Sequence, residues 1–172
     1  MSLEDRLNKL QAEIAGKLRQ LPPIIGEEVV NFSLDNFKNQ AWQDKGVEPW
    51  QKRKSPNKWG KVGDNDRALL ISSGKLRRSI RVGQILEDKV QVIAGGADTP
   101  YARAHNEGFK GLVHQQVRDH IRKTRSGQQI QVKAFSRTIN QNIPKRQFIG
   151  NSAQSAELRE RINHLIREVL NQ

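Results

Sequence analysis

Apolar residues near the start of the chain recur every three or four positions, which is the spacing of one face of an α-helix. This stripe consists of Leu3, Leu7, Leu10, Ile14, Leu18 and Leu21. Ser2 stands where an N-cap is expected, and Asp5 follows three residues later. Since a proline disfavours the helical conformation of the residue before it, we expect this helix to end before Pro22–Pro23.

Two further helices are predicted from the same kind of pattern. One begins at Ile24 and has its buried face at Val29 and Phe37. The other forms the end of the chain, where Ser155 is placed to cap it and Glu157 lies near its positively polarised first turn. Its apolar stripe consists of Leu158, Ile162, Leu165, Ile166 and Val169.

The middle of the chain changes to the alternating pattern of a β-strand. Val90, Val92 and Ala94 occupy every second position, so their side chains share one face. We expect strands over residues 76–83, 89–95 and 145–149, paired in one antiparallel sheet that the N- and C-terminal helices cover. The predicted core consists of Leu70, Leu76, Ile80, Val92, Phe148, Leu158, Ile162 and Leu165.

Residues 109–143 predict a long β-hairpin. Val113 and Val117 alternate on one arm and Ile130 and Val132 on the other, around a turn in which Gly127 can adopt a positive φ. Both faces of the predicted hairpin are mostly polar and basic, which leaves too little apolar surface for a core. Because an isolated hairpin is marginally stable, we expect this one to project and to be poorly ordered alone.

These elements predict an α+β fold in a single domain, residues 1–172. Its parts are N-terminal helices over 1–48, a basic loop over 49–68, a central sheet segment over 69–108, the hairpin insertion over 109–143, and a return strand with the C-terminal helix over 144–172. The chain has no Cys, and no run approaches the about 20 apolar residues that span a bilayer. We therefore expect a cytoplasmic protein without membrane contact.

The net charge of +12 is concentrated in two segments. Residues 49–81 and residues 109–146 each carry +8, whereas the rest of the chain is close to neutral or slightly acidic. Such segregation indicates surfaces for an anionic partner, either nucleic acid or acidic protein, although a solvated basic surface has the same composition. The candidate partner- or DNA-facing residues are Arg53, Lys54, Lys58, Arg118, Arg122, Lys123, Arg125, Lys133 and Arg137.

Two tryptophans lie in or beside the first basic segment. Trp50 and Trp59 could stack on bases, as aromatic residues among Lys and Arg do in single-strand binders. Alternatively, each pins the loop to its own domain. Like charges on copies of one small domain repel, so we expect the free protein to be monomeric or weakly associated and to associate more at high salt.

The sequence carries no recognisable catalytic motif. The four histidines lack the i, i+4 spacing of a zinc protease, and no Gly-rich phosphate loop is followed by Lys and Ser or Thr. His105-Asn106-Glu107 shares letters with the HNH nucleases, but three adjacent residues cannot supply that family's separated metal site. His105 is better interpreted as a packing or hydrogen-bonding residue, so we predict no enzyme, metal or cofactor.

Five short motifs occur in a fixed order between residues 42 and 150. They are Trp42…Trp50, Leu70-x-x-Ser73-Gly74-x-Leu76-x-x-Ser79-Ile80, Val90-x-Val92, Tyr101-Ala102-x-x-His105-Asn106-Glu107-Gly108, and Pro144-x-Arg146-x-Phe148-Ile149-Gly150. Together with the helix that follows, they resemble the phage virion morphogenesis family, which groups tail-completion proteins of the phage Mu G and phage P2 S types. The resemblance covers about residues 30–170. The family usually has a basic or small residue between Pro and Phe, and the Lys145-Arg146-Gln147 run is a mild variation of that pattern. The hairpin region varies most in such proteins, so the resemblance assigns no residue roles there.

This resemblance implies a structural protein of tail completion or head–tail joining that works as an oligomeric ring without a cofactor. Its expected partners are copies of itself, other phage neck, portal or tail proteins, and DNA in the channel. Its expected location is the bacterial host cytoplasm during assembly and then the virion, and a prophage can encode it. The alternatives are a nucleic-acid-binding protein that uses the basic hairpin and loop, and a toxin or nuclease-like enzyme for which no residues can be named.

Overall fold

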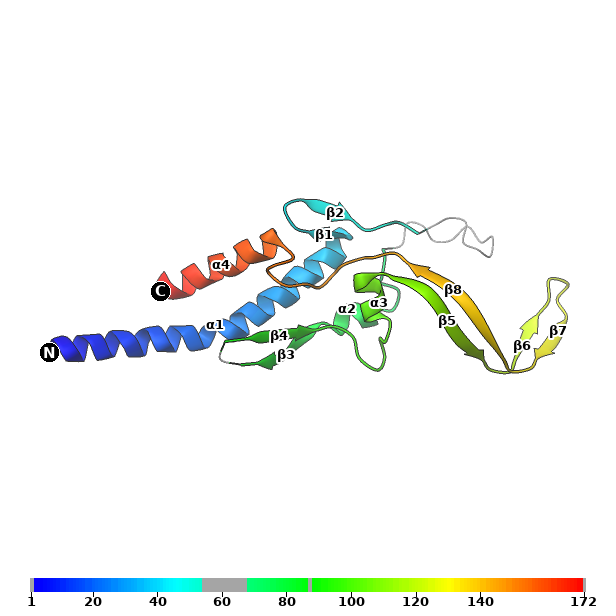
Figure 1. The fold of residues 1–172 in the computed structure, drawn as a ribbon, viewed down its shortest axis with the longest axis horizontal. Helices are drawn as coiled ribbons and strands as arrows, with labels where there is room; N and C mark the ends of the chain where they lie inside the picture. The colour runs from blue at the N-terminus through cyan, green and yellow to red at the C-terminus, as the bar shows by residue number, and fades with distance from the viewer. Residues whose placement is uncertain (1, 54–67, 87, 172) are drawn as a thin grey trace.

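The computed structural model describes residues 2–53, 68–86 and 88–171. It is an α+β fold in which long N- and C-terminal helices flank small antiparallel two-stranded sheets (Figure 1). The elements are α1 (Leu3–Asn39), β1 (Ala41–Gln43), β2 (Val47–Pro49), α2 (Lys75–Arg78), β3 (Arg81–Ile85), β4 (Val90–Ile93), α3 (Ala102–Glu107), β5 (Phe109–Val117), β6 (His120–Lys123), β7 (Gln129–Val132), β8 (Phe135–Ile143) and α4 (Ala156–Asn171). The strands pair as β1–β2, β3–β4, β5–β8 and β6–β7.

Helix α1 is continuous through Pro22 and Pro23, so the predicted helix end before them is wrong. Neither proline can donate to the carbonyl four residues earlier, and Figure 1 shows α1 bending partway along its length. Packing on either side of the prolines offsets this loss. Leu21 and Gly26 are both buried, and a Cβ at Gly26 would lie only 3.0 Å from side-chain carbons of Val82 and Val90. The β3–β4 hairpin therefore packs directly against α1 just after the two prolines.

The central sheet is smaller than predicted. Residues 75–78 form the short helix α2, and only β3 and β4 pair, with Val82 opposite Val92. The predicted strand at 145–149 is wrong, because this segment bonds to α3 instead of to a strand. The amide of Arg146 donates to the carbonyl of His105 at 2.8 Å. The amides of Phe148 and Ile149 both donate to Oδ1 of Asn106, at 3.0 and 3.1 Å.

The core consists of two adjoining clusters along α1. The larger contains Phe37, Trp50, Leu69, Leu76, Ile80, Ala102 and Phe148. The smaller contains Phe32, Trp42 and Leu158. Of the predicted core residues, Leu76, Ile80, Phe148 and Leu158 are buried, whereas Leu70, Val92, Ile162 and Leu165 are only half-buried. The smaller cluster joins α4 to α1.

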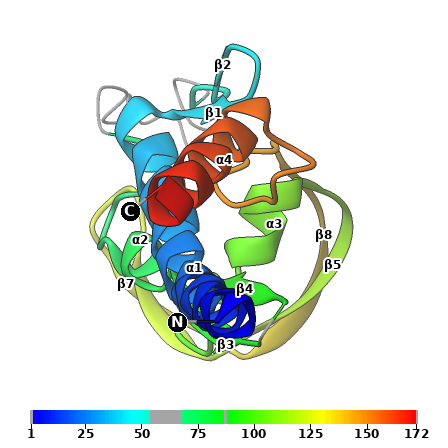
Figure 2. The same cartoon turned by 90° about the vertical axis from the view of Figure 1, so that its left-hand side faces the viewer.

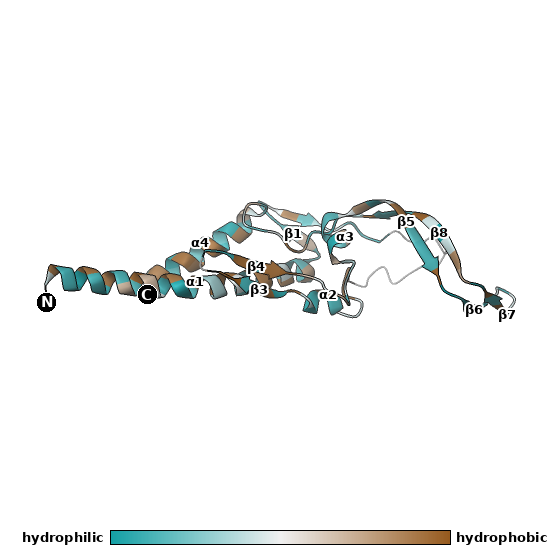
Figure 3. Cartoon of the chain, turned by 60° about the horizontal axis from the view of Figure 1, so that its bottom comes forward, coloured by the Kyte–Doolittle hydropathy of each residue, from teal (hydrophilic) through white to brown (hydrophobic). Residues whose placement is uncertain are grey.

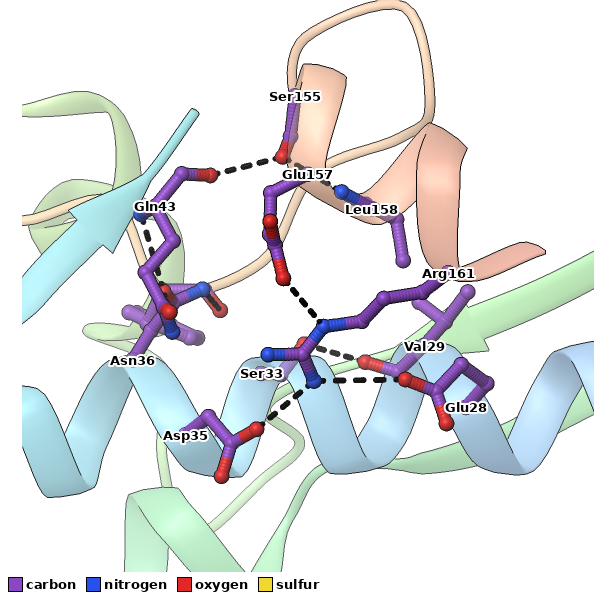
Figure 4. Close-up of polar contacts among 11 residues, drawn as sticks. Glu28, Val29, Ser33, Asp35, Asn36, Gln43, Ser155, Glu157, Leu158 and Arg161 are labelled. Carbon is purple, nitrogen blue, oxygen red and sulfur yellow. Dashed lines mark hydrogen bonds and ion pairs between the residues drawn. The ribbon is translucent and has the colours of Figure 1, made fainter. Parts of the chain in front are cut away.

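Polar contacts complete the junction of α4 with α1 (Figure 4). Ser155 caps α4 as predicted, since its Oγ accepts from the amide of Leu158 at 3.0 Å. The Arg161 guanidinium contacts three carboxylates, those of Asp35 at 2.8 Å, Glu157 at 2.9 Å and Glu28 at 3.4 Å. Partial burial lowers the pKa of Arg161, but the hydrogen bonds that its guanidinium donates to these carboxylates outweigh the effect of burial and raise the pKa above its ordinary value. Arg161 thus joins two segments that are far apart in sequence.

The Arg161→Gln variant should lower the free energy of unfolding by about 1–3 kcal/mol, between the values for exposed and for buried ion pairs. The intermediate value is expected because the Asp35 and Glu157 side chains stay 40% and 38% exposed, so water screens part of the interaction. Urea denaturation measures the change. Arg167→Gln, on the exposed part of the same helix, is the control and should change stability little. Equal effects of the two substitutions would contradict the role of the carboxylate cluster.

The segment 109–143 forms a hairpin, as predicted, and it extends from the body at the end opposite the free end of α1 (Figure 1). Strands β5 and β8 form nine consecutive pairs, and the shorter β6–β7 pair continues toward the turn. One face of β5–β8 is less polar than expected. The register places the apolar pairs Phe109↔Ile143, Val113↔Ile139 and Val117↔Phe135 on it, in alternation with Gly111↔Gln141 and Gln115↔Arg137.

Candidate functional site

The family-motif residues meet around the short helix α3 at the base of the hairpin. Ala102 of α3 is buried against Gly95, where an added Cβ would lie 2.9 Å from the Ala102 Cβ. Gly108 has φ +79°, and a Cβ there would meet the backbone of Lys145 at 3.1 Å. Glycine at position 108 therefore lets the start of β5 and the return segment (residues 145–149) pass close to each other. Asn106 then ties the return segment to α3.

The earlier motif residues build the support under α3. Ser79 Oγ donates to the carbonyl of Leu76 and accepts from the amide of Gly95, at 2.7 and 2.9 Å. Gly74 begins α2 with φ +71°. At the other end of the cluster, a Cβ on Gly150 would lie 2.7 Å from the ring of Trp42. These contacts fix the positions of α2, Gly95 and Gly150 around α3.

A small basic pocket of about 350 Å³ lies beside this junction. Its lining includes Arg53, Tyr101, His105 and Arg146. Arg146 is buried and donates from Nε and Nη2 to the carbonyl of Gln51 at 3.0 and 2.8 Å. Burial lowers the pKa of Arg146, and the nearby positive charge of Arg53 lowers it further. The pocket therefore concentrates positive charge near the motif residues.

His105 lies beside the two arginines in this pocket. Its Nδ1 is buried without a hydrogen-bond partner in the described part of the chain. Burial lowers its pKa below 6.5, and the positive charge of Arg146 lowers it further. The imidazole is thus kept neutral at pH 7, in line with a packing role and not with that of a proton donor.

Acid should destabilise the protein through His105. Above about pH 6.5 the imidazole is neutral in both states. As the pH falls below that value, the unfolded chain binds the proton more readily than the native chain, so the free energy of unfolding decreases down to the lowered native pKa. His105→Gln should flatten this part of the stability–pH curve, measured by urea denaturation between pH 7 and acid conditions. An unchanged slope in His105→Gln would contradict the assignment.

The structure brings six of the nine candidate basic residues together on the hairpin. Arg118, Arg122, Lys123, Arg125, Lys133 and Arg137 are all exposed there. Arg137 also donates to Oε1 of Gln115 across the β5–β8 ladder, at 2.8 and 2.6 Å. Arg53 lies apart in the basic pocket, where it donates to the carbonyl of Ala68 at 3.0 Å. Lys54 and Lys58 fall outside the described residues.

Trp50 packs within its own domain. The ring is 5% exposed and lies edge-on to Phe37, with 5.4 Å between centroids. Its Nε1 donates to the carbonyl of Gln147 at 2.8 Å. Trp50 is therefore not available to stack on a base, and the alternative reading, in which it pins the chain, is correct. Trp59 falls outside the described residues.

Sequence reasoning missed Asn36, which is fully buried in α1. Its Nδ2 donates to the carbonyl of Phe148 at 3.3 Å, and its Oδ1 accepts from the amide of Gln43 at 3.2 Å. The signal was available in the sequence, because Asn36 lies next to Phe37 on the apolar face of a helix. A polar residue in that position must find partners inside the core.

In the described ranges 2–53, 68–86 and 88–171, no helix is long and apolar enough to cross a membrane, and no group of His, Asp and Glu could hold a metal ion. No curated protein and no solved structure matches the chain. The model of one protein family does match, that of the phage virion morphogenesis family, over residues 1–171.

Proposed function

Because this chain belongs to the phage virion morphogenesis family, we propose that it completes the tail or joins head to tail in a phage particle, as one subunit of a ring. The family itself indicates a structural role in building the virion, and association with the virion, in agreement with the resemblance in the motifs. Tail completion, head–tail joining and ring formation go beyond the family assignment and are what we propose.

The observation that carries this proposal is the placement of charge on an extended arm. Six basic side chains lie exposed on a hairpin that projects from a small core (Figure 1). The opposite end carries the free half of α1, along which apolar residues recur (Figure 3). A ring subunit needs separate surfaces for its two neighbours and for whatever occupies the channel, and the two projections supply such surfaces.

The basic hairpin also favours a second candidate function, binding of nucleic acid. The two functions are compatible if the hairpin faces DNA in the channel. The salt dependence of DNA affinity distinguishes them. A dedicated binder with about six phosphate contacts should lose on the order of 10³-fold or more in affinity between 50 and 200 mM salt. Weak binding without that dependence would favour a purely structural role in which the hairpin contacts acidic protein.

Disrupting the gene in the phage or prophage that encodes it tests the proposed function. We expect electron microscopy to show separated heads and tails, or tails of abnormal length, and a loss of infectious particles. Expression of the intact chain from a plasmid should restore normal particles. Complete, infectious particles in the disrupted strain would rule out the proposed function.

A further inference from the structure

The N-terminal half of α1 carries an apolar surface that nothing in the described chain covers. We call Leu3, Leu7, Leu10 and Ile14 the leucine stripe; their exposed fractions are 74%, 51%, 52% and 43%. This part of the helix extends beyond both α4 and the β3–β4 hairpin (Figure 1). A capping box between Ser2 and Asp5 closes its first turn. The stripe is therefore a preformed helical surface of the kind that docks in a groove.

A second apolar surface begins where the stripe ends. Ala15 and Leu18 start a groove that continues between α1, the β3–β4 hairpin, α3, the return segment and α4; Figure 2 shows α3, α4 and β4 arranged around α1. We call it the apolar groove, and its apolar lining includes Leu21, Ile25, Leu86, Val92, Ile149 and Ile162. Its volume of about 1360 Å³ exceeds the about 300–1,000 Å³ typical of small-molecule sites. A helix suits this space better than a metabolite does.

We propose that the leucine stripe of one copy docks in the apolar groove of a second copy. The stripe cannot enter its own groove, because both lie on one continuous helix and the stripe precedes Leu18 on the same helical face. A contact between two different surfaces is heterologous, so each copy offers a stripe to one neighbour and a groove to the other. Such contacts close into rings when the rotation allows it. The inference rests on the proposed function and names the contact that builds the ring.

The charges around the two surfaces are complementary at one end of the proposed contact. Among the described residues at the groove, Arg103 and Glu107 pair with each other at 2.9 Å. The remaining charged lining residues are three cations and one anion, namely Arg19, Lys89, Lys145 and Asp88. The stripe begins in a turn that carries Glu4 and Asp5, and the cations of this half of the helix, Arg6 and Lys9, follow after it. Docking would place this turn against a basic rim. The stripe spans residues 3–14, a helical length of about 18 Å, so a single contact is small, and a closed ring multiplies it.

Engineered cysteines can test this contact without background, because the chain contains no Cys. Copies with Leu7→Cys and copies with Leu86→Cys are mixed at high salt, which screens charge repulsion, and treated with a short bis-maleimide. While two copies are docked, their thiols have an effective concentration of about 1 mM, so a docked pair should cross-link on the order of 1,000-fold faster than by collision at about 1 μM protein. Lys9→Cys and Ala12→Cys lie on the opposite helical face and should cross-link to Leu86→Cys only at the collision rate.

Two outcomes would overturn the inference. One is equal cross-linking from Lys9→Cys, or none from Leu7→Cys. The other is Leu7→Cys joining its own kind faster than Leu86→Cys, which would mean that stripes pair with each other. Charge variants give an independent test. Leu7→Glu blocks the stripe and Leu86→Glu blocks the groove, so neither variant alone should associate with copies of itself. In a mixture, the intact stripe of one variant should dock in the intact groove of the other, which gives a one-to-one dimer that cannot grow further. No such dimer by native mass spectrometry would overturn the inference too.

The inference and the proposed function can fail separately. If a gene disruption blocks assembly but Leu7→Glu restores it fully, the stripe is not the ring contact and the proposed function stands. If the disruption leaves assembly intact, the proposed function fails whatever the cross-linking shows. Circular dichroism of every variant checks that these exposed positions do not alter the fold.

Discussion

Removal of the hairpin should abolish phage assembly and leave the rest of the protein folded. Leu112 and Asn140 are direct partners in the β5–β8 ladder, so residues 113–139 can be replaced by an Asn-Gly turn, which suits a two-residue hairpin connection. None of the deleted residues belongs to either core cluster. We expect the free energy of unfolding to change by less than about 1 kcal/mol, as for changes away from a core, and infectious particles to fall to the level of the gene disruption.

A charge-neutralised hairpin is the matched control for this deletion. Replacing the six basic residues of segment 113–139 by Gln keeps the ladder and its apolar pairs but removes the positive charge of that segment. If this variant also fails in assembly, the charge is what the partner binds; if it assembles, the face with the apolar pairs carries the contact. A large loss of stability on deletion would show that the hairpin supports the core, and full infectivity after deletion would contradict its role in assembly.

Substitution of Asn106 by Leu should cost about 2–4 kcal/mol of unfolding free energy, because two backbone donors lose their acceptor and each costs about 1–3 kcal/mol when left unpaired. Those donors are the amides of Phe148 and Ile149. The lower part of the summed range applies because Asn106 is only half-buried and water can reach part of the site. Urea denaturation at neutral pH measures the change.

Asn106→Asp separates the hydrogen bonds from the shape of the side chain. A carboxylate keeps an acceptor in the Oδ1 position, so this variant should lose much less stability than Asn106→Leu. Its effect on infectivity should follow its effect on stability, because Asn106 acts by holding the return segment against α3. Equal stability of the Leu and Asp variants would show that these two hydrogen bonds do not hold the segment.

Local patterns in the sequence were sufficient for the elements whose partners lie nearby. The stripe from Leu158 to Val169 and the N-terminal leucines specify helices because the 3.6-residue period acts within the segment itself. The hairpin turn is equally local: Gly127 adopts φ +87°, and its amide donates to the carbonyl of Thr124 at 3.1 Å. The order of the motifs was also enough to indicate the family, which the comparison over residues 1–171 confirms.

Other features depended on contacts between distant segments. Pro22–Pro23 carries a strong local signal for a helix end, yet packing of Gly26 against Val82 and Val90 keeps α1 continuous. Residues 145–149 have an extended pattern, but whether their amides bond to a strand or to Asn106 depends on where α3 lies. Arg161 likewise meets its carboxylates only after α4 has packed on α1.

The sequence by itself therefore determined the helical character of both ends of the chain, the hairpin over residues 109–143, where the charge lies and which family the chain resembles. Only the tertiary structure decided which apolar residues find partners within the chain. The leucines at positions 3–18 and those at 158–169 have the same period, but the second set faces α1 and the first set faces solvent. Periodicity reports that a face is apolar; what covers that face depends on the three-dimensional arrangement of segments far apart in the sequence.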